Sequence, residues 1–184
     1  PNSVQIIGSQ AFCDCTNLQQ LEINCNDLTE IPHAAFQNCR SITGNIKLPD
    51  KLTKISSNAF ENCSEISNEI TFPSNLEIIG NFAFKQCYKL KINIDFPDTI
   101  QSIGSSSFYE CTGLTQIIKL GDNLQEIPDH SFYYCENAEG VLTIPRSVTR
   151  IGYYSFKNCS KLNGLQFQCQ NLINISNGAF LYCT

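Results

Sequence analysis

The chain has 184 residues and a formal net charge of −5, and only 16% of its residues are charged. This acidic balance argues against nucleic-acid partners and anionic membrane surfaces, which both select a basic face. No apolar run approaches the ~20 residues that a helix needs to span a bilayer, so we expect no membrane insertion by this segment.

Two residue types recur along the whole chain with a period of 24 residues. The phenylalanines are Phe12, Phe36, Phe60, Phe84, Phe108, Phe132, Phe156 and Phe180. The cysteines follow three residues later, at Cys15, Cys39, Cys63, Cys87, Cys111, Cys135, Cys159 and Cys183. A fixed period of this length is typical of a solenoid. Because an active site needs a unique set of residues, we assign both series to the core.

Other positions keep the same period and divide each unit into elements. An isoleucine stands five residues before every repeating Phe, and the residue before each Phe is Ala or Ser. Prolines and glycines occur at turn positions between these segments. Each unit therefore predicts a short strand, a turn, an extended segment, a second turn and one short helical turn, such as 57–63. We expect short parallel strands near residues 21–24, 45–48, 69–72, 93–96, 117–120, 141–144 and 165–168.

Eleven cysteines would ordinarily suggest disulfides, but the spacing argues against them. Cysteines at one position of successive units point in parallel, whereas a disulfide needs Cβ vectors directed at each other. We therefore predict buried, unpaired thiols that act as small hydrophobic residues, at Cys39, Cys63, Cys87, Cys111, Cys135 and Cys159.

The strand segments are of two kinds. Residues 18–28 have the form L-x-x-L-x-L-x-x-N-x-L, which is the leucine-rich repeat pattern. Residues 42–49 have a shorter apolar alternation that ends in proline. The alternation slips by one residue between the two kinds, which places Leu21 and Ile23 inward in the first and Ile46 and Leu48 inward in the second.

The full unit resembles the BspA-like, or Treponema-type, leucine-rich repeats. Residues 143–159 carry the pattern most completely, through Ile144-Pro145, Val148, Ile151-Gly152, Ser155-Phe156 and Cys159. The resemblance covers the whole chain and implies an α/β solenoid. It would be a right-handed superhelix of about eight repeats, with a parallel sheet on the concave side and short helical turns on the convex side. Related proteins are often cell-surface adhesins of bacteria and protists, and the motif itself carries no catalytic residues.

Few residues suggest chemistry. His33 and His130 lie about four repeats apart and are interpreted as solvated turn residues, and Cys13 with Cys15 matches no zinc signature. We expect no catalytic residues, no metal and no cofactor. Glycosylation sequons begin at Asn62, Asn158 and Asn174.

Two surfaces are candidates for partner binding. Outward residues of the concave strands form the first: Glu22, Asn24, Asn45, Lys47, Glu69, Thr71, Asn93, Asp95, Ile117, Lys119, Val141, Thr143, Gln166 and Gln168. Ile117 and Val141 place apolar side chains where solvent is expected, which favours a contact site. The second is a convex tyrosine patch: Tyr109, Tyr133, Tyr134, Tyr153 and Tyr154. The alternative for these tyrosines is that they cover the edge of the core and keep their hydroxyls in water.

The sequence thus favours a non-enzymatic adhesion or interaction module at the cell surface, which binds a protein or glycan through its concave sheet. An intracellular scaffold is the alternative. We expect residues 1–184 to form one solenoid, cut from a longer array, whose open end coils cause weak end-to-end self-association.

Overall fold

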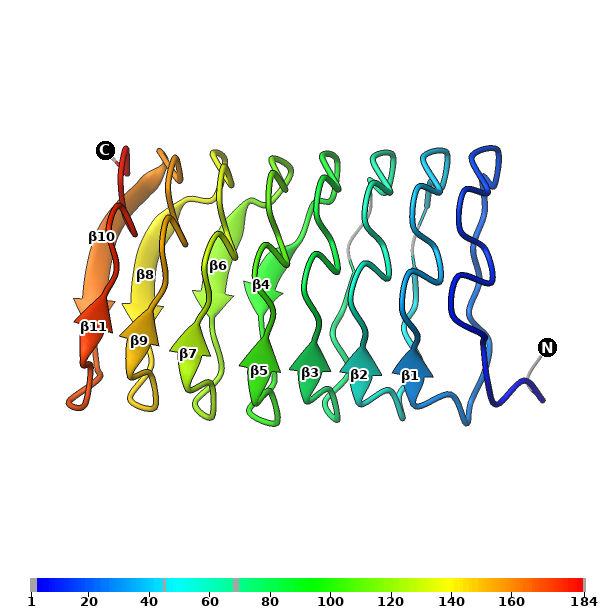
Figure 1. The fold of residues 1–184 in the computed structure, drawn as a ribbon, viewed down its shortest axis with the longest axis horizontal. Helices are drawn as coiled ribbons and strands as arrows, with labels where there is room; N and C mark the ends of the chain where they lie inside the picture. Colours follow the sequence, from blue (N-terminus) through cyan, green and yellow to red (C-terminus); the bar gives the residue numbers. More distant parts are fainter. Residues whose placement is uncertain (1–2, 45, 68–69, 184) are drawn as a thin grey trace.

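The computed structural model describes residues 3–44, 46–67 and 70–183. The chain winds into a solenoid whose coils stack side by side in one row, with the two termini at opposite ends (Figure 1). Equivalent strands recur six times at 24-residue intervals between residues 30 and 174. The predicted parallel solenoid is confirmed, with about six turns shown by its strands, whereas the count of eight repeats stays a prediction.

The first strand ladder consists of two-residue strands that end at the repeating isoleucine. They are β1 (Glu30–Ile31), β2 (Lys54–Ile55), β3 (Ile78–Ile79), β5 (Ser102–Ile103), β7 (Glu126–Ile127), β9 (Arg150–Ile151) and β11 (Asn174–Ile175). Pairing is parallel, in the orders β1-β2-β3-β5 and β7-β9-β11. Within each of the two sheets the isoleucines lie opposite one another, as Ile31 does Ile55 and Ile127 does Ile151. These isoleucines are buried from Ile31 to Ile151, whereas Ile175 at the end of the ladder is 49% exposed.

The second ladder contains the longer strands β4 (Asn93–Asp95), β6 (Gln116–Lys119), β8 (Gly140–Ile144) and β10 (Leu162–Phe167). Parallel pairs join β4 to β6 and β8 to β10. We call the surface that these strands and the equivalent segments 21–24, 46–48 and 70–72 turn to solvent the strand face. These four strands confirm four of the seven predicted positions.

Described residues of the other three predicted segments form no strand, so that part of the prediction is wrong. Segment 21–24 begins a one-residue slip in alternation, which between β8 and β10 is accommodated by a register shift. Ile23 and Ile46 both point inward, at 7% and 2% exposure, although their positions in the repeat differ by one residue. A side-chain period of two prevents such segments from pairing in simple register. In the other two segments, residues 45 and 69 lie outside the described residues.

The predicted helical turns are also wrong, because no helix occurs in the described part of the chain. Each unit instead has a run of overlapping turns, residues 56–63 and their equivalents, which we call the turn ribbon. The N–H groups of Asn58, Phe60 and Asn62 donate to carbonyl groups of the next coil at 2.8–2.9 Å. Those of Ala59, Glu61 and Cys63 donate to the carbonyl three residues earlier, at 3.1–3.3 Å. Alternate amides therefore join coils, whereas a helix would use all of them internally.

This bonding pattern requires left-handed backbone on both sides of the phenylalanine. Asn58 and Asn62 have φ of 61° and 60°, and the same two positions of every coil are left-handed. Asparagine, aspartate and glycine tolerate this conformation best. Even Phe82 adopts it, with φ of 58°, which indicates that the contacts between coils fix the backbone.

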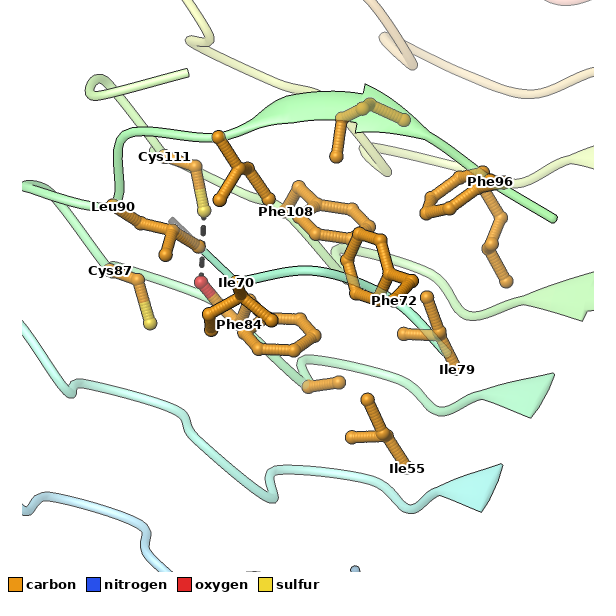
Figure 2. Packing of buried hydrophobic residues seen from close by; sticks show 14 of the residues in the cluster. Ile55, Ile70, Phe72, Ile79, Phe84, Cys87, Leu90, Phe96, Phe108 and Cys111 are labelled. Atoms are coloured by element: carbon orange, nitrogen blue, oxygen red, sulfur yellow. Dashed lines mark hydrogen bonds between the residues drawn. The ribbon is translucent and has the colours of Figure 1, made fainter. Parts of the chain in front are cut away.

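The eight repeating phenylalanines form one column through the core. Consecutive ring centroids lie 5.2–5.4 Å apart and their planes differ by at most 11°. Phe72 and Phe96 come from the strand side and contact the Phe84 and Phe108 rings at larger angles (Figure 2). The column keeps the coils at one spacing, because each of the six inner rings contacts the ring before and the ring after it.

The cysteine column gives the buried thiols a second role. Each thiol donates to the carbonyl oxygen of the phenylalanine 27 residues earlier, as Cys111 does to Phe84 at 3.0 Å (Figure 2). The same bond recurs from Cys39 to Cys183 at 2.9–3.2 Å. All six cysteines predicted to be buried are buried, and none is in a disulfide. The prediction of buried, unpaired thiols is confirmed.

Replacing Phe84 with Ala should destabilise the solenoid by about 3–5 kcal/mol, because a fully buried ring is removed from the middle of the column. His33→Ala changes an exposed side chain and should cost less than about 0.5 kcal/mol. Urea denaturation of both variants measures the difference. Equal midpoints would contradict the core assignment.

Stability should fall as pH rises above about 9. Burial raises the pKa of the Cys39 thiol from 9.0 to about 11, and burial also raises the pKa of Cys63, Cys87 and Cys111. A group whose folded pKa is raised contributes stability that is full below its unfolded pKa and is lost as pH rises through the folded pKa. Cys39→Ala should therefore lose less stability than the parent between pH 9 and 11. Parallel losses in the two proteins would show that other groups cause the decline.

Candidate functional site

The strand face presents most of its predicted residues to solvent. Glu22, Asn24, Lys47, Thr71, Asp95, Val141, Gln166 and Gln168 are exposed, and Lys119 and Thr143 are half-buried. Asn45 and Glu69 lie outside the described residues, as does the side chain of Asn93. Val141 is 49% exposed although it is aliphatic and lies in β8, so its prediction as an outward apolar residue is confirmed.

Ile117 was predicted to be outward, and this is wrong, because its side chain is only 4% exposed. Its partner in register is the buried Ile94, whereas Asp95 pairs with Lys119. The register therefore shifts by one residue at position 118, which is a β-bulge in β6. The bulge lets Ile117 join the core and still returns Lys119 to the strand face.

A shallow groove of about 400 Å³ with a mixed polar and apolar lining crosses this face where β4, β6, β8 and β10 lie together. Asp95, Lys119, Thr143 and Gln168 contribute to its lining from successive coils. The ammonium of Lys119 lies 2.6 Å from Asp98, a hydrogen bond that raises the pKa of Lys119 and lowers that of Asp98. Lys119, the one cation among the described residues that line the groove, is thus already neutralised within the protein.

The predicted tyrosine patch lies on the turn ribbons of the C-terminal coils. The rings of Tyr109 and Tyr133 stack at 4.7 Å with planes 5° apart, and Tyr134 contacts Tyr133 at 5.2 Å. Tyr134 and Tyr153 are 40% and 47% exposed. The structure therefore brings Tyr109, Tyr133 and Tyr134 into contact.

Three residues of this surface were missed in the sequence. His130 lies in a turn, as expected, but it is half-buried and its ring lies 5.6–6.4 Å from the rings of Tyr109, Tyr133 and Tyr154. The ammonium of Lys157 lies 5.4 Å, 4.7 Å and 6.0 Å from the ring centroids of Tyr133, Tyr154 and Tyr182. Lys157 occupies the repeat position of Tyr109 and Tyr133, and aligning the units by position would have found it. We call Tyr109, His130, Tyr133, Tyr134, Tyr153, Tyr154, Lys157 and Tyr182 the aromatic patch.

The same positions in the N-terminal coils carry a polar network instead. Glu61 accepts hydrogen bonds from Gln37 at 2.7 Å, Asn58 at 2.5 Å and Lys85 at 3.1 Å. Burial raises the pKa of Glu61, but these three hydrogen bonds outweigh burial and hold it below its ordinary value. The network is internally satisfied, and it offers an incoming ligand no unpaired charge at Glu61 or Lys85.

Other candidate residues form no chemical site. His33 and Cys15 are exposed, and partial burial raises the pKa of the Cys13 thiol. Within residues 3–44, 46–67 and 70–183, no three His, Cys, Asp or Glu side chains are placed to hold a metal ion.

No helix of the described chain is long and apolar enough to cross a membrane. At the sequons, Asn62 donates to Asn38 at 3.0 Å and Asn174 is exposed in β11.

The sequence and the fold were compared with known proteins. Residues 1–94 and 91–184 match the family model described as BspA type leucine rich repeat region, with six copies. A search of curated proteins gave no match.

Several solved structures share the fold. A leucine-rich repeat protein of T. pallidum is 26% identical, with a TM-score of 0.74 over 86% of this chain and 72% of that one. One from Eubacterium ventriosum is 21% identical, with a TM-score of 0.73 over 89% of this chain but only 42% of its own. A leucine rich cell surface protein of Faecalibacterium prausnitzii is 22% identical, with a TM-score of 0.54 over all of this chain and 69% of that one. Both halves of the chain match the family pattern, and its 24-residue coils have the fold of these proteins, so the chain belongs to the BspA-type leucine-rich repeat family.

Proposed function

We propose that this chain is a non-enzymatic interaction module exposed at a cell surface, which binds a protein or a glycan through its strand face. The observation that supports this most is how the sequence varies. Inward positions repeat the same few side chains, whereas outward positions of β4, β6, β8 and β10 differ from coil to coil. A solenoid offers a broad surface of this kind for a macromolecular ligand. Family membership adds support, since leucine-rich repeats are generally scaffolds without catalysis.

The cell-surface location draws support from relatives of the same fold. One matched structure is named as a cell surface protein and another, 19% identical with a TM-score of 0.52, as a pneumococcal vaccine antigen. An intracellular scaffold is the second candidate, favoured by thiols that donate hydrogen bonds and are therefore reduced. Antibody labelling of intact and permeabilised source cells separates the two, because an intracellular scaffold is labelled only after permeabilisation.

We expect Val141→Lys to weaken ligand binding about tenfold, because it places a charge at the exposed aliphatic residue of the strand face. An array of purified matrix proteins and defined glycans provides the binding measurement. Gln101→Lys is the matched control, since it adds the same charge at an exposed residue outside the strand face. Equal binding by the two variants, or no saturable binding by the parent, would contradict the proposal.

We also propose that a polypeptide of these 184 residues associates weakly end to end. Phe12 in the first coil and Leu165 and Phe167 in β10 are 41–46% exposed, although Phe36 of the next coil and the β8 partners Leu142 and Ile144 are buried. Head-to-tail stacking would place Phe180 of one molecule on Phe12 of the next and continue the column. Sedimentation velocity at rising concentration should reveal this association, and Phe12→Lys should reduce it. A strict monomer at every concentration would contradict this proposal.

A further inference from the structure

The turn ribbons carry different chemistry in the two halves of the solenoid. In the N-terminal half, Lys85 forms an ion pair with Glu61 at 3.1 Å. Lys157 stands three coils later at the same repeat position, and its ammonium lies over tyrosine rings. No carboxylate of the described residues pairs with it. A cation held at an aromatic surface without a counter-ion is complementary to an anionic group of a ligand.

Two tyrosine rings and the side-chain amide of an asparagine between them form a row next to Lys157. Tyr134, Asn158 and Tyr182 occupy one repeat position on three successive coils, joined by the backbone bonds from Tyr134 to Lys157 and from Asn158 to Leu181. Tyr134 and Tyr182 are 40% and 61% exposed. The side-chain amide of Asn158 makes no hydrogen bond within the part of the chain that the structure describes. At the equivalent position of an earlier coil, Asn62 uses its amide to bond Asn38.

These groups match the chemistry of a sugar that carries a carboxylate. An aromatic ring offers an apolar surface to the C–H face of a pyranose ring, and a tyrosine adds a polar hydroxyl. The amide of Asn158 has both a donor and an acceptor for ring hydroxyls. The ammonium of Lys157 can form a charge-assisted hydrogen bond with a carboxylate. The neutralised Lys119 of the strand-face groove does not offer such a site.

We propose that Tyr134, Lys157, Asn158 and Tyr182 bind a linear glycan built from uronic acids. The choice of a linear polymer follows from the site, because Tyr134, Asn158 and Tyr182 lie at one position of three successive coils and a chain of linked sugar units can meet them in turn. This inference rests on the proposed function as a binding module, but it places a glycan site on the turn ribbons and not on the strand face.

Binding of oligogalacturonate to the purified chain, measured by calorimetry, tests the proposal. The fully methyl-esterified oligomer has the same rings without the charge and should bind about tenfold more weakly, which is the effect of losing one hydrogen bond to a charged group. Lys157→Gln should weaken binding of the acid about tenfold and leave binding of the ester unchanged. Tyr134→Ala should weaken both ligands about fivefold. Raising the salt concentration should weaken binding of the acid only.

Lys85→Gln is the matched control, because Lys85 has the same repeat position three coils away and should leave oligogalacturonate binding unchanged. Equal thermal midpoints of the parent and Lys157→Gln exclude a folding defect. The proposal is overturned if the acid does not bind saturably, if acid and ester bind equally, or if sialyllactose or an oligoglutamate peptide binds more tightly. Val141→Lys should bind oligogalacturonate like the parent. A failed glycan site therefore leaves the strand-face proposal standing, and the reverse also holds.

Discussion

Alternate amides of each turn ribbon find their acceptors in the next coil, and this constraint determines most of the structure. Phe60 donates to Ala83 at 2.8 Å, and the equivalent bond recurs in the other coils. Buried amides cannot be left without partners, because each would cost about as much as a lost hydrogen bond. The turn ribbons must therefore stack in one register, whereas the strands of the strand face accommodate one-residue shifts. The 24-residue period of the sequence follows from that register, because equivalent residues of successive coils must lie side by side.

The side chains around these bonds follow from the same spacing. Rings 5.2–5.4 Å apart leave room for only a small residue before each phenylalanine, and that position is always Ala or Ser. Ser107, Ser131 and Ser155 occupy it with hydroxyls that have no partner in the described structure, which indicates that the position selects size and not polarity. The cysteine is small enough to be buried and its thiol reaches the phenylalanine carbonyl of the preceding coil.

The sequence predicts the solenoid, its inward positions and its thiols because each of these recurs at one fixed position. It does not predict the turn ribbon correctly, because a Phe and a Cys three residues apart fit a helical turn and a run of β-turns equally well. The left-handed backbone at Asn58 and Asn62 distinguishes the two, but other coils have Phe82 or Tyr134 there, which do not suggest it. Ile117 was misplaced because a bulge is a property of strand pairing. Lys157 and His130 were missed since a contact between rings and cations joins neighbouring coils, not neighbouring residues.

Inner positions of each coil maintain the fold, and outer positions are available to bind ligands. This separation explains how one fold can present different binding surfaces. Inner positions are fixed by the bonds between coils, so changes accumulate on the strand face and on the outer side of the turn ribbons. The variable positions include the exposed Val141 on the strand face. On the turn ribbons they include Lys157, whose ammonium lies among tyrosine rings. Recognition can then differ between the two surfaces without any change in the core.

The bonds between coils can be observed directly by NMR, through scalar couplings across hydrogen bonds in the labelled protein. The structure predicts couplings from the amide nitrogens of Asn58, Phe60 and Asn62 to the carbonyl carbons of Asn81, Ala83 and Lys85 in the next coil. Couplings from Phe60 to the carbonyl of Ser56, four residues earlier, would instead show a helical turn and contradict the account.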